Sequence, residues 1–154
     1  MKWHFWCGYV VTFLLAFRLV WGFIGPAPAR FSSFLRGPKA IGGYVSHMFL
    51  REPSYWPGHN PLGALSVIAM LAALVAQVLS GAMSESENFV DAGPLASSVS
   101  AATRAAAKDY HEFGANLILL LVLLHIGVIL FYRFWKREDL VGPMVHGSKQ
   151  VRED

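Results

Sequence analysis

The residues with the clearest capacity for chemistry in this 154-residue chain are three histidines, His4, His111 and His125. His111 and His125 share one long apolar run and lie 14 residues apart. At about 100° and about 1.5 Å per residue, this spacing returns to within about 40° of the same helix face and separates the side chains by about 21 Å. One helix face would therefore present two imidazoles at two depths. The pattern predicts axial ligands for two haems stacked across a membrane.

Small residues and an arginine near His4 fit the same interpretation. His4 is followed four residues later by Gly8, and Arg18 lies 14 residues after His4. His4 and His111 are both expected at outer helix ends, so together they could clamp one iron. Gly8 would leave room for a flat porphyrin, and Arg18 could pair with haem propionates. The alternatives are that the histidines are hydrogen-bonded packing residues and that Arg18 extends to the inner headgroups.

Three apolar runs of about 20 residues, at about 5–25, 62–83 and 113–135, are the elements that would hold these side chains. Each is long enough to cross a hydrocarbon core of about 30 Å as a helix. The chain is 55% hydrophobic and 15% charged, whereas soluble domains carry about 25% charged residues. The sequence therefore excludes a soluble enzyme and predicts one all-α integral membrane domain over 1–154, with lipid around it. Nucleic acid is not an expected partner, because the net charge of +3 is spread over loops.

Lysine and arginine beside the helix ends predict the orientation. Four basic residues lie in the segment 26–61 and five lie after Phe131, whereas 84–112 carries two basic residues among five acids. We therefore expect a cytoplasmic loop at 26–61, a cytoplasmic tail at 136–154 and an N-terminus outside. The outer loop 84–112 should contain an alanine-rich surface helix that leads into the third span. Asn60 is expected to cap the second span, with Pro61 as its first helical residue.

Short motifs run in a fixed order along nearly the whole chain, from about His4 to Lys149. They are Arg18 to Gly25, Ala29 to Phe34, Gly58 to Ala64, Gly93 to Ala96, His111-Glu112 with Asn116, and Leu140 to Lys149. Together they resemble the bacterial cytochrome b561 and nickel-hydrogenase b-type cytochrome family. The resemblance implies a four-helix protein of the bacterial cytoplasmic membrane with two b-type haems. It also implies that His4 and His111 ligate the outer haem and that His125 is one ligand of the inner haem.

The chain departs from this family at its start, because Met1 falls just before the family's second helix. The family's first helix supplies the second ligand of the inner haem and has no counterpart here. Four explanations stay open: a start assigned too late, a helix from another polypeptide, an inner haem that is absent or five-coordinate, or a local histidine as substitute. The last fits the geometry worst, since His125 should lie about 15 Å deep, whereas His47 and His59 lie near or beyond the inner surface. Three spans forming most of a four-helix haem-binding bundle are therefore expected.

The function implied by the resemblance is electron transfer between a quinone pool and a redox partner, such as a c-type cytochrome or a dehydrogenase or hydrogenase subunit. The expected cofactor is non-covalent haem b, one or two per chain, with quinone as a further candidate ligand. Covalent haem attachment is excluded, because Cys7 is the single cysteine. Enzymatic turnover is expected only as quinol oxidation or quinone reduction. Two alternatives stay open: a single-haem anchor of a quinone-linked oxidoreductase that does not use His125, and a non-redox structural anchor.

Overall fold

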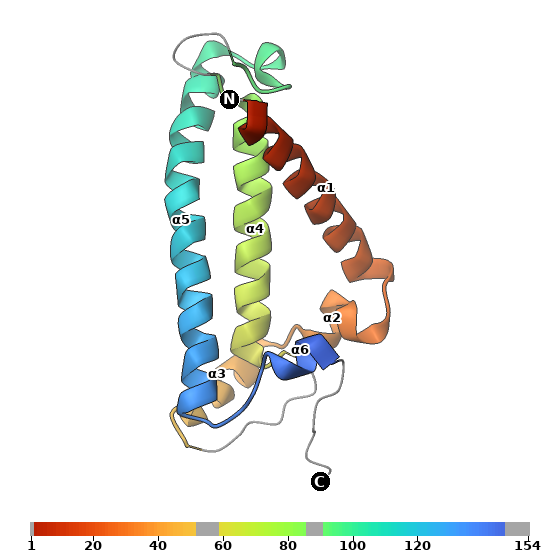
Figure 1. Cartoon of the computed structure of the whole chain (residues 1–154), viewed down its shortest axis with the longest axis vertical. Coiled ribbons are helices and arrows are strands. Elements are labelled where there is room, and N and C mark those ends of the chain that lie inside the picture. The colour runs from red at the N-terminus through yellow and green to blue at the C-terminus, as the bar shows by residue number, and fades with distance from the viewer. Residues whose placement is uncertain (1, 52–58, 86–90, 147–154) are drawn as a thin grey trace. The chain divides into compact units, whose positions relative to one another are not determined.

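The computed structural model describes residues 2–51, 59–85 and 91–146, and its regular elements there are helical apart from one β-bridge between Glu85 and Ala92. The helices α1 (Lys2–Ile24), α4 (Pro61–Met83) and α5 (Ala101–Phe134) are long and apolar enough to cross a membrane (Figure 1). The shorter elements are η1 (Ala27–Ala29), α2 (Phe31–Phe34), α3 (Pro38–His47), η2 (Ala96–Ser98) and α6 (Gly142–His146). The predictions of an all-helical fold and of three spans are confirmed. The predicted features at Gly58 and at 147–154 lie outside the described residues.

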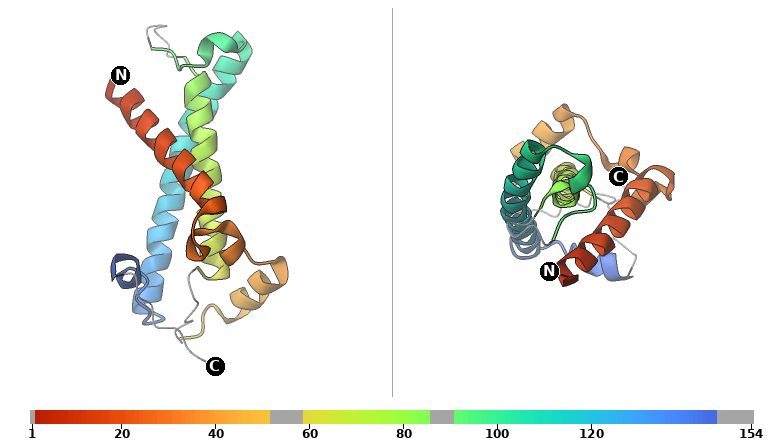
Figure 2. Two further views of the ribbon diagram at one scale, coloured as in Figure 1. Left: turned by 90° about the vertical axis from the view of Figure 1, so that its right-hand side faces the viewer. Right: turned by 90° about the horizontal axis from the view of Figure 1, so that it is seen from above.

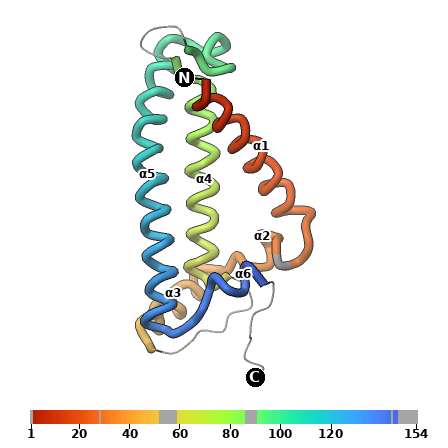
Figure 3. Tube along the Cα trace, viewed as in Figure 1, coloured from red at the N-terminus to blue at the C-terminus, as the bar shows by residue number. Residues whose placement is uncertain are grey.

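Helix α5 is one continuous element. A surface helix over about 95–110 was expected to lead into the third span, and the structure runs one helix from Ala101 to Phe134, which begins later than 95 (Figure 3). Its start is fixed by Ser100, whose Oγ accepts a hydrogen bond of 3.1 Å from the Thr103 amide. No proline interrupts the following sequence, and alanine favours helix more than any other residue. The helix is therefore about 51 Å long, which exceeds the apolar thickness of a bilayer.

Helix α4 begins as predicted. The side-chain oxygen of Asn60 accepts a hydrogen bond of 2.8 Å from the Gly63 amide, and Pro61 is the first helical residue. At the other end, the amide of Gly93 donates to the Ser84 carbonyl at 2.9 Å and that of Leu95 to Ala82 at 2.8 Å. These two bonds satisfy carbonyls that a helix end leaves without partners.

The turn after α1 is held by a basic side chain. Arg30 donates from Nε to the carbonyl of Gly25 at 2.6 Å, directly after the last residue of α1. Phe31 and Phe34 are buried beside this turn, with ring centres 5.9 Å apart. Figure 2 shows how tightly the chain reverses between α1 and α2. Arg30 therefore has a structural role in addition to its charge.

The chain forms two compact units. The first unit comprises Met1–Gly22 and Ala69–Leu120, and the second comprises Phe23–Ile68 and Leu121–Asp154. In both units most large apolar side chains of the long helices point outward; Phe13 is 71% exposed and Leu124 is 62% exposed. Such a surface is stable against lipid tails and would be costly in water.

Candidate functional site

The first unit brings His4 and His111 together. Their ring centres are 5.8 Å apart and their planes are nearly perpendicular, at 82°. Imidazole nitrogen binds zinc at about 2.0–2.1 Å, and bonds of that length place two opposed rings on one metal with centres about 6 Å apart. The observed separation is close to this value. The pair comes from the start of α1 and from α5, as the matched depths of the two residues predicted.

Helix α4 contacts the His111 ring through two polar groups. Nδ1 of His111 lies 3.0 Å from the Gln77 carbonyl oxygen and 3.3 Å from Oγ of Ser80. Because a carbonyl oxygen only accepts, Nδ1 carries the proton and donates it. In the tautomer with its proton on Nδ1, the lone pair of Nε2 is available to a metal. A metal-binding histidine commonly donates its other ring N–H to a carbonyl in this way.

Gln77 and Ser80 are themselves fixed. The side-chain amide of Gln77 donates to the His111 backbone carbonyl at 2.9 Å, so Gln77 contacts His111 through both its backbone and its side chain. Ser80 is 4% exposed and donates its hydroxyl proton to the Gln77 carbonyl at 3.0 Å. The lone pairs of Ser80 Oγ are then available to accept from Nδ1 of His111. Two polar groups of α4 thus contact the imidazole of His111, and a third contacts its backbone.

Glycines make room around this pair. A Cβ on Gly81 would lie 2.7 Å from Cε1 of the His111 ring, so only glycine lets the ring pack against α4. A Cβ on Gly114 would collide with Oε1 of Gln77. In contrast, a Cβ on Gly8 would meet nothing within 4 Å. The expected role of Gly8 beside a planar group stays a prediction.

In the second unit His125 has a similar neighbour. Nδ1 of His125 lies 3.4 Å from Oγ of Ser66, which also belongs to α4. The His59 ring packs on Phe34 at 5.0 Å, and Nδ1 of His47 lies 3.0 Å from the Gly43 carbonyl of its own helix. His59 and His47 are therefore each in contact with a residue of a neighbouring segment or of the same helix.

Arg18 lies on α1 in the first unit with a half-buried side chain. Its expected role with propionates, and the ligand roles of the histidines, stay predictions. Among the described residues, no group of three or more His, Cys, Asp or Glu is gathered as a metal cluster. The histidine pair therefore does not extend to the three or four protein ligands that a zinc site uses.

The polar residues of α4 were missed by sequence reasoning. Gln77, Ser66 and Ser80 lie within an apolar span, where a polar side chain is costly and normally has a specific partner. That rule was applied to the histidines and Arg18 and could have been applied to these three residues as well.

The family model described as prokaryotic cytochrome b561 matches residues 1–147. The chain belongs to the prokaryotic cytochrome b561 family. A curated relative, a probable Ni/Fe-hydrogenase B-type cytochrome subunit from Rhizobium leguminosarum bv. viciae, is 24% identical over 173 aligned positions, which cover 97% of this chain and 68% of the relative. A search of solved structures gives no match.

As a cytochrome b561 family member, the chain is a multi-pass membrane protein with three candidate spans. The family binds haem b, and electron transfer is the function that membership implies. The residues of the first unit fit such a group. Two imidazoles lie with ring centres 5.8 Å apart, and Nδ1 of His111 contacts a carbonyl oxygen, so Nε2 is the nitrogen of that ring that a metal could bind.

Proposed function

We propose that this chain carries electrons in the bacterial cytoplasmic membrane between a quinone pool and a redox partner, using haem b held by His4 and His111. The observation that supports this most directly is the 5.8 Å separation of the two rings. The contacts of His111 with Gln77 and Ser80 account for the placement of that ring on α4, but they do not account for the approach of the His4 ring from a helix distant in sequence. A shared iron accounts for the arrangement.

A bound haem supplies one-electron redox chemistry, with a potential set by its ligands and surroundings. The chain's own residues bind and orient it. His4 and His111 provide Nε2 atoms, and Gln77 and Ser80 fix the tautomer and rotation of the His111 ring. The apolar side chains of the spans keep water away, which lowers the local dielectric constant and so influences the potential.

A second haem is proposed at His125. The support is its position 14 residues after His111 on α5 and the hydroxyl of Ser66 beside its Nδ1. With this haem nearer the cytoplasmic side, electrons could cross the membrane in two steps. The orientation proposed from the basic residues places His111 near the outer face and His125 toward the inner one.

The proposed partner on the outer face is a hydrogenase or another dehydrogenase subunit. The support is the curated relative, which is named as a hydrogenase cytochrome subunit. A c-type cytochrome is the second candidate, and quinol or quinone would exchange electrons at a haem edge.

Haem content per chain tests the proposal. The chain, purified in detergent, should show the absorbance of about two b-type haems per polypeptide. His111→Ala should remove the haem of the first unit and leave the other, whereas His146→Ala, in α6, should leave both. An unchanged spectrum in His111→Ala would refute the assignment. If the chain binds one haem and His125→Ala does not change it, the single-haem anchor of a quinone-linked oxidoreductase is favoured. If the chain folds without any haem, the non-redox structural anchor is favoured.

A further inference from the structure

Two serines of α4 stand in the same relation to two histidines of α5. In the first unit Oγ of Ser80 lies 3.3 Å from Nδ1 of His111, and in the second unit Oγ of Ser66 lies 3.4 Å from Nδ1 of His125. The serines are 14 residues apart in sequence, as are the histidines. The pairing occurs twice, and each time it involves the ring nitrogen that a metal bound at Nε2 would leave free.

We infer that Ser66 and Ser80 are positioning residues, each of which accepts a hydrogen bond from the Nδ1–H of one haem-ligating histidine and thereby sets the potential of that haem. The inference rests on the proposed function, since it takes both histidines as ligands. Helix α4 contains no histidine. In this inference its serines influence how strongly both histidine ligands donate electrons to iron.

The direction of the hydrogen bond follows from the neighbours of Ser80. Its own proton goes to the Gln77 carbonyl at 3.0 Å, so its oxygen is free to accept from His111. An accepted Nδ1–H bond makes an imidazole a stronger electron donor through Nε2 and stabilises the oxidised iron. Loss of the hydroxyl should therefore raise the midpoint potential of the haem concerned.

The two sites should differ in how much they depend on serine. His111 keeps the Gln77 carbonyl at 3.0 Å when Ser80 is lost. At His125 the contact that the structure gives for Nδ1 is the one to Ser66. Ser66→Ala should therefore change its haem more than Ser80→Ala changes the other.

The test is a redox titration of the purified chain with electron paramagnetic resonance of each oxidised haem. Ser66→Ala should raise the potential and move the g values of the His125 haem alone, with up to about tenfold weaker haem retention. Ser80→Ala should act on the His111 haem alone and less strongly. Ser66→Thr and Ser80→Thr, which keep the hydroxyl, should restore the wild-type potentials. Ser84→Ala is the matched control, because Ser84 directly follows α4 and its hydroxyl donates to the carbonyl of Gly81.

The outcomes separate this inference from the proposed function. If wild type binds two histidine-dependent haems but the alanine variants leave both potentials unchanged, the positioning role is wrong and the cytochrome function stands. If the alanine variants shift the potentials but threonine does not restore them, the serines act through packing and the inference fails. If wild type binds only one haem, the positioning role of Ser66 at a His125 haem is wrong. If wild type binds no haem, the proposed function itself fails.

Discussion

Gly81 of α4 lies directly against the imidazole of His111, so close that a Cβ there would stand 2.7 Å from Cε1 and 3.0 Å from Nδ1. Because the ring is held on this side by Gln77 and Ser80, it has little freedom to retreat. Gly81→Ala should therefore turn or displace the imidazole and weaken haem retention at this site by about 10-fold or more.

Haem content and the absorbance of the His4–His111 site after size-exclusion chromatography measure this effect. Gly43→Ala is a suitable control, since a Cβ at that helical position would meet nothing within 4 Å. If Gly81→Ala retains its haem as wild type does, the observed packing of His111 on α4 does not describe the haem-bound protein.

The sequence was sufficient to predict the spans and the histidine pair. The length of the three apolar runs is enough to predict α1, α4 and α5. An asparagine followed by a proline is a common start of a helix, and it predicts the beginning of α4 at Asn60 and Pro61. The expected depth of His4 and His111 allowed the two residues to share one iron, and it follows from positions along single helices. The contact between the two rings depends on how α1 and α5 are rotated, and the structure supplies it.

The polar partners of the histidines could not be predicted in the same way. Which α4 residues face His111 depends on the rotation and register of α4 against α5, and a single sequence does not contain that information. The polar residues Lys108 and Asp109 do not interrupt α5, since charged residues cost little in a helix outside the apolar core.

Gly93→Ala should destabilise the connection between α4 and α5. A Cβ at Gly93 would collide with the backbone carbonyl oxygens of Gly81 and Ala82, which cannot rotate away as a side chain could. The segment would have to lift, and the bonds from Gly93 to Ser84 and from Leu95 to Ala82 would weaken. We expect a loss of about 1–3 kcal/mol, as for other overpacked sites.

Thermal unfolding of the detergent-solubilised chain, followed by circular dichroism, checks the effect of Gly93→Ala. Gly42→Ala, at a position with nothing within 4 Å, provides the comparison. Equal midpoints for the two variants would show that the Gly93 segment does not pack on the end of α4 as the structure has it.

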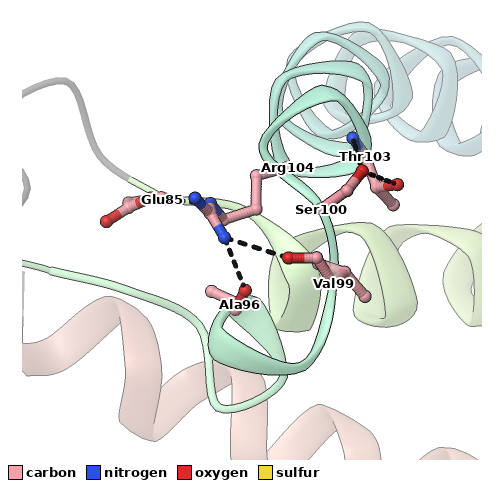
Figure 4. A network of polar contacts seen from close by, with 6 residues as sticks. All are labelled: Glu85, Ala96, Val99, Ser100, Thr103 and Arg104. Carbon is pink, nitrogen blue, oxygen red and sulfur yellow. Dashed lines mark hydrogen bonds and ion pairs between the residues drawn. The ribbon is translucent and has the colours of Figure 1, made fainter.

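Arg104 should hold the segment that precedes α5. Its Nη1 donates to the carbonyls of Ala96 and Val99 at 3.1 and 3.0 Å, and its Nε lies 2.9 Å from a carboxylate oxygen of Glu85 (Figure 4). Arg104→Met keeps the length of the side chain but leaves two carbonyls and a carboxylate without this donor. Limited proteolysis of the segment 91–100 should become faster.

Glu85→Gln is the matched variant for Arg104, because it keeps an acceptor oxygen and removes only the charge. Its effect should be smaller than that of Arg104→Met, since the ion pair is about a quarter to a third exposed and exposed pairs contribute little. A larger effect in Glu85→Gln would mean that the ion pair, and not the two carbonyl bonds, holds the segment.

The turn before α6 should depend on pH through Asp139. Hydrogen bonds from the Gly142 and Val141 amides, followed by the charge of Arg133, hold the pKa of the Asp139 carboxyl below its ordinary value. A lowered pKa in the folded protein means that the carboxylate stabilises the turn above the pKa of the unfolded chain, about 3.9. This contribution is lost as the pH falls from there through the lowered pKa. Hydrogen-exchange protection of the Val141 and Gly142 amides, corrected for intrinsic rates, should therefore decrease in this acidic range. Asp139→Asn should show lower protection at neutral pH and little further change on acidification, and a wild-type profile that stays flat to pH 2 would contradict the role of the carboxylate.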